Sequence, residues 1–269
     1  GPGGKITRTT PEKSVGQLVP IIRRIGAGGD RYTAMFGWMV GAFLSDGWVN
    51  GIIGYTKASF EHRAKFIKGV EEHCGHDCVA RLYEAMHEAE TNHGIGGLSQ
   101  KIHIRPETPE MKGLYSYFES MFTASREERI ASGSRSCIFK KMPDDLFQWS
   151  EEALLGLLSG LLDGDGSVAV SRAKKKPQVI VNFSTSAPAL RDGIVLLLKI
   201  LGIHSSYSEV HPSEKRVQKE INYCVSVSSP DFCNHLDRLD VFDSEGLQIL
   251  RRDGVSKNDV DVVPVDFEI

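Results

Sequence analysis

Two aspartates, Asp46 and Asp165, occupy the same place in two similar stretches of the sequence. Each follows an apolar run with two glycines four residues apart, and each precedes another glycine. A Gly-x-x-x-Gly spacing places both glycines on one helical face and lets a second backbone approach closely. If two such helices pack together, the two carboxylates emerge at the same end of the pair and repel unless a cation lies between them. Oxygen ligands of this kind suit Mg²⁺ or Ca²⁺ rather than Zn²⁺.

The similarity between the two stretches continues beyond the aspartates. Residues 36–47 align with residues 155–166 without a gap, and elements of the same kinds follow both. Strands are expected at 54–58 and 179–184. Each leads into a helix, at 60–73 and at 188–201, with Ser59 and Ser186 as the N-caps and Gly75 and Gly202 at the C-terminal ends. Two further strands follow in each copy, and then final helices at 109–122 and 230–239. The sequence therefore predicts the order α-β-β-α-β-β-α written twice.

This duplication defines the organisation that we expect for the chain. Residues 1–30 are interpreted as a tag remnant with an N-terminal lead-in. One repeat is expected at 31–135 and the second at 136–252, followed by a C-terminal tail at 253–269. A single α+β unit with two related halves is therefore predicted.

Four glycines indicate how the two copies meet. Gly37 and Gly41 share one helical face, and Gly156 and Gly160 share the other. Each glycine costs about 1 kcal/mol of helix propensity relative to alanine, so four of them favour a packing role. We expect the two helices to pack on each other about a pseudo-twofold axis.

The second stretch resembles a known signature. Leu158–Gly166, which reads Leu-Ser-Gly-Leu-Leu-Asp-Gly-Asp-Gly, is similar to the nonapeptide of the LAGLIDADG homing endonucleases. Met39–Gly47 is a degenerate copy that keeps the glycine and the closing Asp-Gly. The resemblance covers about residues 31–252 and concerns the single-chain, two-repeat form of the family. It implies a pseudo-twofold LAGLIDADG endonuclease fold with saddle-shaped DNA-binding sheets.

The resemblance also implies an activity and a metal site. It implies a site-specific endonuclease that hydrolyses one phosphodiester bond in each strand of a long double-stranded DNA target. In the family the eighth motif residue binds the catalytic divalent metals, and this position corresponds to Asp46 and Asp165. Ser45 and Gly164, which precede them, are the further metal ligands expected. Mg²⁺ is the expected cofactor, and Ca²⁺ could occupy the same sites without supporting cleavage.

Basic catalytic residues are implied in the same way. Intein-associated members of the family carry a Lys-x-x-Pro segment before the second motif, and Lys140–Pro143 matches it. Lys140 is therefore expected to be catalytic and to lie near the solvent network of the reaction. A second basic partner stays open among Arg251, Arg252 and Lys257.

The strands are expected to lie along the major groove of DNA and to contact base edges and phosphates. The segment 166–190 contains basic residues and no acidic one. Candidate DNA contacts are Lys57, Gln100, Lys101, His103 and Arg105 in the first copy, and Arg172, Lys174, Lys175, Lys176, Arg216 and Lys219 in the second. Strand register decides which face each side chain occupies, so the choice among them stays open.

The overall charge gives a different first impression. Thirty-two Lys and Arg residues against 35 Asp and Glu residues leave a net charge of −3, which excludes a polybasic protein and by itself disfavours a nucleic-acid partner. Four of the acidic residues lie in the tail after Lys257, at Asp259, Asp261, Asp266 and Glu268. The local distribution of charge is therefore compatible with DNA binding.

Other features indicate the class of protein. The apolar stretches are shorter than the roughly 20 residues needed to cross a bilayer. Five scattered cysteines favour a reduced, intracellular, soluble protein. His73–Cys78 suggests zinc, but it has no second Cys/His pair at a suitable spacing, so a helix end with buried thiols is preferred. A monomer is expected because one chain carries both half-sites.

An alternative function stays open. A non-cleaving descendant of the same fold, either a transcription factor or an intron maturase, would bind DNA or RNA without cutting it. Retention of both Asp46 and Asp165 favours the endonuclease. The tail resembles the sequence that follows the endonuclease block in some inteins, but no splicing nucleophile or closing His-Asn is found, so self-splicing is not expected.

Overall fold

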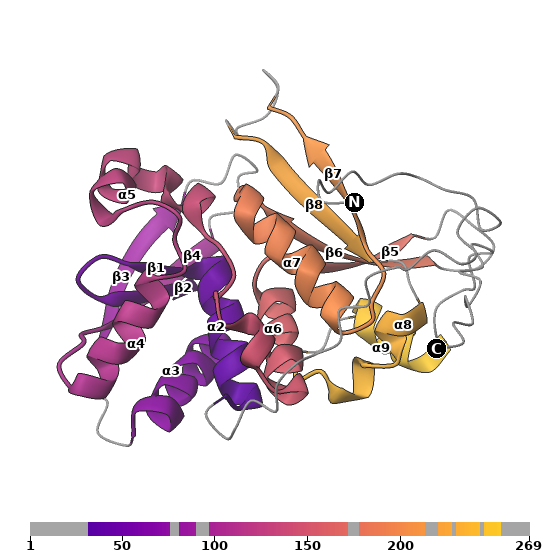
Figure 1. Cartoon of the computed structure of the whole chain (residues 1–269), viewed down its shortest axis with the longest axis horizontal. Coiled ribbons are helices and arrows are strands. Elements are labelled where there is room, and N and C mark those ends of the chain that lie inside the picture. The colour runs from indigo at the N-terminus through magenta and orange to yellow at the C-terminus, as the bar shows by residue number, and fades with distance from the viewer. Residues whose placement is uncertain are drawn as a thin grey trace, which may run out of the picture.

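The computed structural model describes residues 32–75, 81–89, 97–171, 178–212, 220–227, 230–242 and 245–253. These residues form two similar units on either side of a central helix pair (Figure 1). The first unit contains α2 (Ala34–Asp46), β1 (Gly47–Val49), β2 (Ile53–Lys57), α3 (Phe60–Cys74), β3 (Arg81–Ala89), β4 (Gly97–Ile104) and α4 (Pro109–Glu119). The second contains α6 (Glu151–Gly164), β5 (Gly166–Ser171), β6 (Gln178–Thr185), α7 (Pro188–Ile200), β7 (Ser206–Val210), β8 (Asn222–Val227) and α8 (Pro230–Cys233).

Each unit builds one antiparallel four-stranded sheet. The strand orders are β1-β2-β4-β3 and β5-β6-β8-β7, so each strand of the first sheet has a counterpart at the same place in the second. Between the units lie α5 (Arg126–Ser132) and the 3₁₀ segments Gly133–Phe139 and Leu146–Gln148, and α9 (Glu245–Asp253) follows the second unit. The predicted α+β architecture is confirmed, with the predicted order of elements in both units.

Helices α2 and α6 pack through their glycines, as predicted. A Cβ atom at Gly37 would lie 2.0 Å from the carbonyl oxygen of Ala153, and one at Gly156 would lie 2.0 Å from the carbonyl oxygen of Ala34. The contacts are therefore reciprocal, and at this distance no side chain fits. The second glycines make the equivalent contacts, with a Cβ at Gly41 lying 2.4 Å from Leu157 O and one at Gly160 lying 2.1 Å from Trp38 O.

The hydrophobic core surrounds this pair. Both helices are apolar nearly all round and are buried along most of their length, which is expected of helices enclosed by other elements. Phe43 of α2 stacks on Phe118 of α4, with ring centroids 4.0 Å apart. Tyr55 of β2 stacks on Phe66 of α3 at 4.4 Å. The described helices of the first unit therefore pack on one face of its sheet and not on the other, which is called the open face below.

The structure corrects two of the expected element ends in the second unit. Ser186 is not the N-cap of α7; Ala187 occupies that position, and Thr185 Oγ1 accepts a hydrogen bond from its main-chain N–H at 3.1 Å. The final helix does not run through 230–239. The helix α8 ends at Cys233, and a separate 3₁₀ turn follows at Leu236–Arg238. Between them the ring of His235 lies 3.0 Å from the Leu201 carbonyl oxygen at the end of α7.

In the first unit α4 is shorter than expected. It ends at Glu119, because Phe122 pairs with Lys140 through an isolated antiparallel bridge. The N-cap Ser59 is confirmed, with its hydroxyl accepting from the main-chain N–H of His62 at 3.3 Å. Among the described residues, none of the helices has the length and apolar character needed to span a bilayer.

Candidate functional site

The aspartates lie where the two central helices end. Asp46 is the last residue of α2, and Asp165 directly follows α6. The helix ends are in close contact here, since a Cβ atom at Gly164 would lie 2.2 Å from the side chain of Ser45. Although part of Asp165 is exposed, desolvation within the site and the negative charge of Asp46 raise the pKa of Asp165 to about 6. The two carboxylates therefore converge as the sequence predicts.

Lys57 supplies a positive charge between the two units. Its Nζ donates to Asp46 Oδ2 at 2.7 Å and to the main-chain oxygen of Gly164 at 3.0 Å. Lys57 ends β2 of the first unit, whereas Gly164 ends α6 of the second. The ion pair is partly sheltered, with 21% of the Lys57 side chain and 26% of the Asp46 side chain exposed. The cation that the repulsion argument requires is thus provided here by a lysine.

Strand register explains why Lys57 lies in this position. Lys57 pairs with Gln100 across β2 and β4, and two residues away Tyr55 pairs with Ile102. Alternate residues of a strand share a face, and Tyr55 and Ile102 are buried against the helices. Lys57 and Gln100 therefore belong to the helix-facing side, where Gln100 accepts a hydrogen bond from Arg63. Strand register therefore gives no support to a contact of these two residues with DNA on the open face of the sheet, and their role in DNA binding stays a prediction.

Lys140 is buried beneath the site. It is 4% exposed, and its Nζ donates to the main-chain oxygens of Phe43, Leu44 and Ser45 at 3.1, 2.9 and 2.9 Å. An ammonium has three donors, so all are used. Burial lowers the pKa of Lys140, whereas the charges of Asp165 and then Asp46 oppose that shift. The ammonium caps the C-terminus of α2, where a positive charge is favourable. Lys140 also lines the cleft beside Asp46, and its expected catalytic role stays a prediction.

The donor atoms fit a divalent cation that prefers oxygen. Two carboxylates and the main-chain oxygens of Ser45 and Gly164 lie at the helix ends, where these two oxygens accept hydrogen bonds from Lys140 and Lys57. Within the described part of the chain, no cluster of three or more His, Cys, Asp or Glu side chains occurs that could hold a metal by itself. Mg²⁺ needs no such cluster, since it binds through one or two carboxylates together with water and substrate phosphate. In the His73–Cys78 segment, which suggested zinc, Cys78 lies outside the described residues.

Asp163 has a different environment from Asp165. Its carboxylate accepts from Trp38 Nε1 at 2.7 Å and from the main-chain N–H of Phe242 at 2.9 Å. Desolvation by burial raises the pKa of Asp163, and these two hydrogen bonds oppose the shift. Asp163 thus fastens the end of α6 to α2 and to the segment that precedes α9.

The open face of the first sheet carries Trp48, Lys101 and His103. Lys101 pairs with Thr56, and Trp48 and His103 both pair with Gly54, so these residues alternate with the buried set. The rings of Trp48 and His103 meet edge to face at 5.3 Å, across the space that the absent Gly54 side chain leaves free. Burial and then the charge of Lys101 lower the pKa of His103, which favours the neutral imidazole. Arg105 is exposed just beyond the end of β4.

The open face of the second sheet carries an uncharged polar row where it is described. Ser167, Asn182 and Ser226 form a row across β5, β6 and β8, and the Ser226 hydroxyl donates to Asn182 Oδ1 at 2.8 Å. The sequence analysis did not select them, although Asn182 and Ser226 each alternate with buried valine or phenylalanine residues. The basic candidates Arg172, Lys174, Lys175, Lys176, Arg216 and Lys219 lie outside the described residues.

The three candidates for a second basic partner are placed as follows. Arg251 is exposed on α9, which packs on β5 through the close approach of Gly246 to Val168. The side chain of Arg252 and all of Lys257 lie outside the described residues. Among the described residues, the basic side chain that is hydrogen-bonded to one of the two converging aspartates is Lys57, which bonds to Asp46 and belongs to the first unit.

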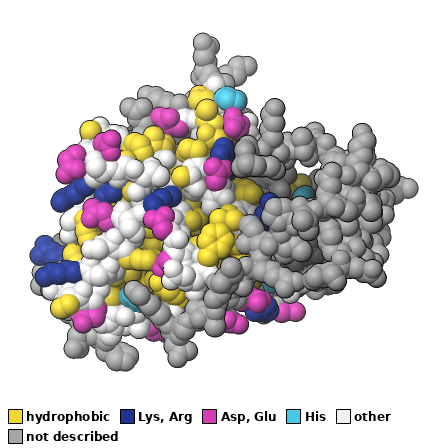
Figure 2. Space-filling model, in the orientation of Figure 1, with side chains coloured by type: hydrophobic (Ala, Val, Ile, Leu, Met, Phe, Trp, Pro, Cys, Tyr) yellow, Lys and Arg dark blue, Asp and Glu magenta, His cyan; other side chains and the backbone are white. Residues whose placement is uncertain are grey.

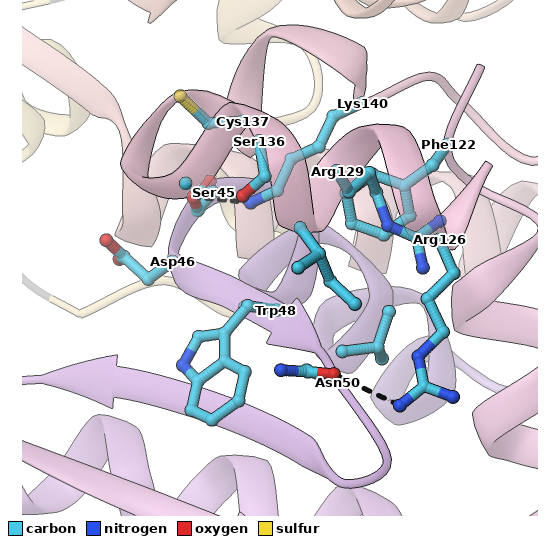
Figure 3. A pocket seen from close by; sticks show the side chains of 14 residues that line it. Ser45, Asp46, Trp48, Asn50, Phe122, Arg126, Arg129, Ser136, Cys137 and Lys140 are labelled. Carbon is cyan, nitrogen blue, oxygen red and sulfur yellow. Dashed lines mark hydrogen bonds between the residues drawn. The ribbon is translucent and has the colours of Figure 1, made fainter. Parts of the chain in front are cut away.

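A cleft of about 440 Å³ opens beside Asp46, between β1 and the segment that joins the units (Figure 3). Its rim is polar: Arg126 donates to the Asn50 side chain at 3.2 Å, and Cys137 is exposed near Ser136. The lining residues are Ser45, Asp46, Gly47, Trp48, Val49, Asn50, Phe122, Arg126, Arg129, Ile130, Gly133, Ser136, Cys137 and Lys140. On the described part of the face seen in Figure 2, basic and acidic side chains are interspersed and do not form one large acidic patch.

Comparison with known proteins finds one family model that matches the second unit. Residues 152–252 match the family model described as a LAGLIDADG-like domain. Among solved structures, variants of the homing endonuclease I-DmoI align over 78% of this chain and 97% of their own, with 12% identity and a TM-score of 0.45. Full-length DUF199/WhiA from Thermatoga maritima aligns over 83% of this chain and 60% of its own, with 11% identity and a TM-score of 0.49.

A further structure, the homing endonuclease I-WcaI bound to its DNA recognition sequence, aligns over 86% of this chain and 88% of its own. Its identity is 9% and its TM-score is 0.47. The family match and the two sheets of equal strand order confirm the predicted α+β LAGLIDADG fold, with the family signature in the second unit.

Proposed function

We propose that this protein is a site-specific endonuclease that uses a divalent metal, Mg²⁺, to hydrolyse one phosphodiester bond in each strand of double-stranded DNA. The observation that carries the proposal is the convergence of Asp46 and Asp165 at the ends of α2 and α6. Each carboxylate leads directly into the first strand of a sheet whose other face is open. Two equivalent acidic positions beneath two open sheets correspond to two scissile phosphates on opposite strands.

The roles of the residues follow from their contacts. Asp46 and Asp165 would hold the metal, with the oxygens of Ser45 and Gly164 nearby. The bound metal supplies charge neutralisation at the phosphate, an activated water and assistance to the leaving oxygen. Lys140 fixes the end of α2, and therefore the position of Asp46, by occupying the last carbonyls of the helix. Its role is positioning, because its three donors are already used.

The open faces of the sheets would receive the DNA. Lys101 contributes a positive charge for phosphate, and Trp48 with the neutral His103 contributes a flat aromatic surface. The Ser167–Asn182–Ser226 row offers donors and acceptors for base edges. Two faces of different chemistry suit a target whose half-sites differ in sequence. We further propose that the protein acts as an intracellular monomer and that Lys140–Pro143 reflects an intein-associated origin.

The test compares wild-type protein with the Asp46→Asn and Asp165→Asn variants on a plasmid that carries the uninterrupted insertion site. Wild-type protein is expected to linearise the plasmid with Mg²⁺ and to leave it intact in EDTA. Both variants are expected to lose double-strand cleavage while they still shift a labelled duplex in a gel. Mg²⁺-dependent cutting by the double variant would contradict the proposal.

The second candidate function is binding without cleavage, to DNA or to structured RNA. The Lys57–Asp46 ion pair favours this second function, because an ammonium bound to the Asp46 carboxylate opposes metal binding there. The same experiment separates the two functions. A wild-type protein that shifts the duplex as tightly in EDTA as in Mg²⁺ and never cuts it would be a binding protein.

A further inference from the structure

We propose that Lys57 occupies the place of a divalent cation between the two units, and that its ammonium leaves this place when a cation binds at Asp46. The inference rests on the proposed metal-dependent function and goes beyond it by naming an exchange at the site. Lys57 would then be a positioning residue of the metal-free protein.

The first argument is the pair of oxygens that one ammonium contacts. Lys57 Nζ lies 2.7 Å from Asp46 Oδ2 and 3.0 Å from Gly164 O. These two oxygens come from different units, and both belong to the set that would bind the metal. Divalent cations approach oxygen ligands to about 2.0–2.6 Å. A cation bound to both oxygens would therefore occupy the same space as the ammonium, and the two cannot be present together.

The second argument is that the lysine can leave without disturbing the fold. Arg63, which is buried in α3, donates to the main-chain oxygens of Lys57 and Ala58 and so fixes the backbone at the end of β2. The side chain is partly exposed and ends in a flexible four-carbon stem. Displacement therefore requires only rotation of this side chain toward solvent.

The third argument is that the second unit lacks an equivalent lysine. Gly47 pairs with Tyr55 as Gly166 pairs with Phe183, so Thr185 holds the register position of Lys57. The Thr185 hydroxyl is engaged by the main-chain N–H of Ala187 at the start of α7. Among the described residues, no lysine or arginine forms an ion pair with Asp165. The two aspartates therefore differ, because among the described residues only Asp46 is ion-paired with a lysine that a bound cation would have to displace.

The test measures how fast Lys57 is acetylated by an N-hydroxysuccinimide ester, with mass spectrometry of the digested protein as the readout. The full chain is labelled in EDTA and in saturating Mg²⁺, without DNA. The acetylation rate of Lys57 is expected to rise about fivefold with Mg²⁺. This is the factor by which an ion pair of ordinary strength lowers the reactivity of an amine relative to the unpaired amine. Lys101, on the open face of the same sheet, serves as the internal control whose rate should not change.

The Asp46→Asn variant is the matched control. Without the carboxylate its Lys57 is expected to react quickly in both conditions, so that Mg²⁺ makes no difference. Binding of Mg²⁺ is followed separately by calorimetry in the same samples. If Mg²⁺ binds with dependence on Asp46 and Lys57 stays slow, the exchange is wrong while the proposed function stands. If no Mg²⁺ binds with dependence on Asp46 or Asp165, the proposed function fails, and the exchange fails with it.

Discussion

The carboxylate of Asp163 lies 2.7 Å from the indole nitrogen of Trp38, so that the end of α6 is fastened to the middle of α2. Its second oxygen accepts from the main-chain N–H of Phe242, at 2.9 Å. Asp165, two residues later, lies instead beside Asp46 at the helix ends, with a raised pKa. Two neighbouring aspartates thus have separable roles, one in stability and one at the candidate metal site.

The first prediction tests this separation. Asp163→Ala is expected to lower the free energy of unfolding by about 2–3 kcal/mol, because the Trp38 and Phe242 donors lose their partner. Asp165→Asn is expected to leave the unfolding free energy in EDTA unchanged or higher, while cleavage is lost. Urea unfolding followed by tryptophan fluorescence and plasmid linearisation supply the two readouts. A stable but inactive Asp163→Ala protein, or an unstable Asp165→Asn protein, would contradict the assignment.

The second prediction concerns the helix pair. Gly41→Ala is expected to destabilise the protein by about 1–3 kcal/mol, because its Cβ would lie 2.4 Å from the main-chain oxygen of Leu157 and would push α2 and α6 apart. Gly113→Ala is the matched control, since nothing lies within 4 Å of the added Cβ in α4. There the gain in helix propensity should stabilise the protein by up to about 1 kcal/mol. Equal changes in the two variants, measured by urea unfolding, would argue against close packing at Gly41.

The sequence predicted the helix pair and its aspartates because local patterns determine both. Glycines four residues apart define a helical face, and a following Asp-Gly defines where the helix ends, without reference to any distant residue. The second unit also carries a motif that is close to the family signature. These parts of the fold and of the candidate site therefore follow from short stretches of sequence.

The positions of Lys57 and Lys140 depend on distant contacts and could not be obtained in the same way. Lys57 lies on the helix-facing side only because β2 pairs with β4 in one particular register, and a shift of one residue would turn it to the open face. A signal was present, since Ile53, Tyr55 and Lys57 alternate and the first two are apolar. Lys140 is buried because the Phe122–Lys140 bridge carries it to the end of α2, far away in the sequence.

The third prediction is a pH dependence of stability in the metal-free protein. The pKa of Asp165 is raised from 3.8 to about 6 in the folded protein. Between these values the folded state binds more protons at this carboxyl than the unfolded chain, so its contribution to stability falls as the pH rises from about 4 to 6. Asp165→Asn carries no such charge. In EDTA its melting temperature should exceed that of the wild type at pH 7, and the difference should shrink toward pH 4.

Thermal unfolding across this pH range checks the prediction, with Mg²⁺ as a second variable. Mg²⁺ should raise the melting temperature of the wild type at pH 7, because it binds the folded state. If the difference in melting temperature between the variant and the wild type stays constant from pH 4 to pH 7, folding does not raise the pKa of Asp165 and the prediction is wrong.

The last prediction uses two neighbours in β4 that lie on opposite faces of the sheet. Lys101 lies on the open face and Gln100 on the helix-facing side, where it accepts from Arg63. If the open face receives DNA, Lys101→Ala removes one phosphate contact, which should weaken binding and reduce the slope of log K against log salt by about 1. Gln100→Ala should leave that slope unchanged and lower stability instead, because Arg63 loses a partner. Fluorescence anisotropy with a labelled duplex at several salt concentrations gives the slopes, and an equal loss of slope in both variants would place the DNA elsewhere.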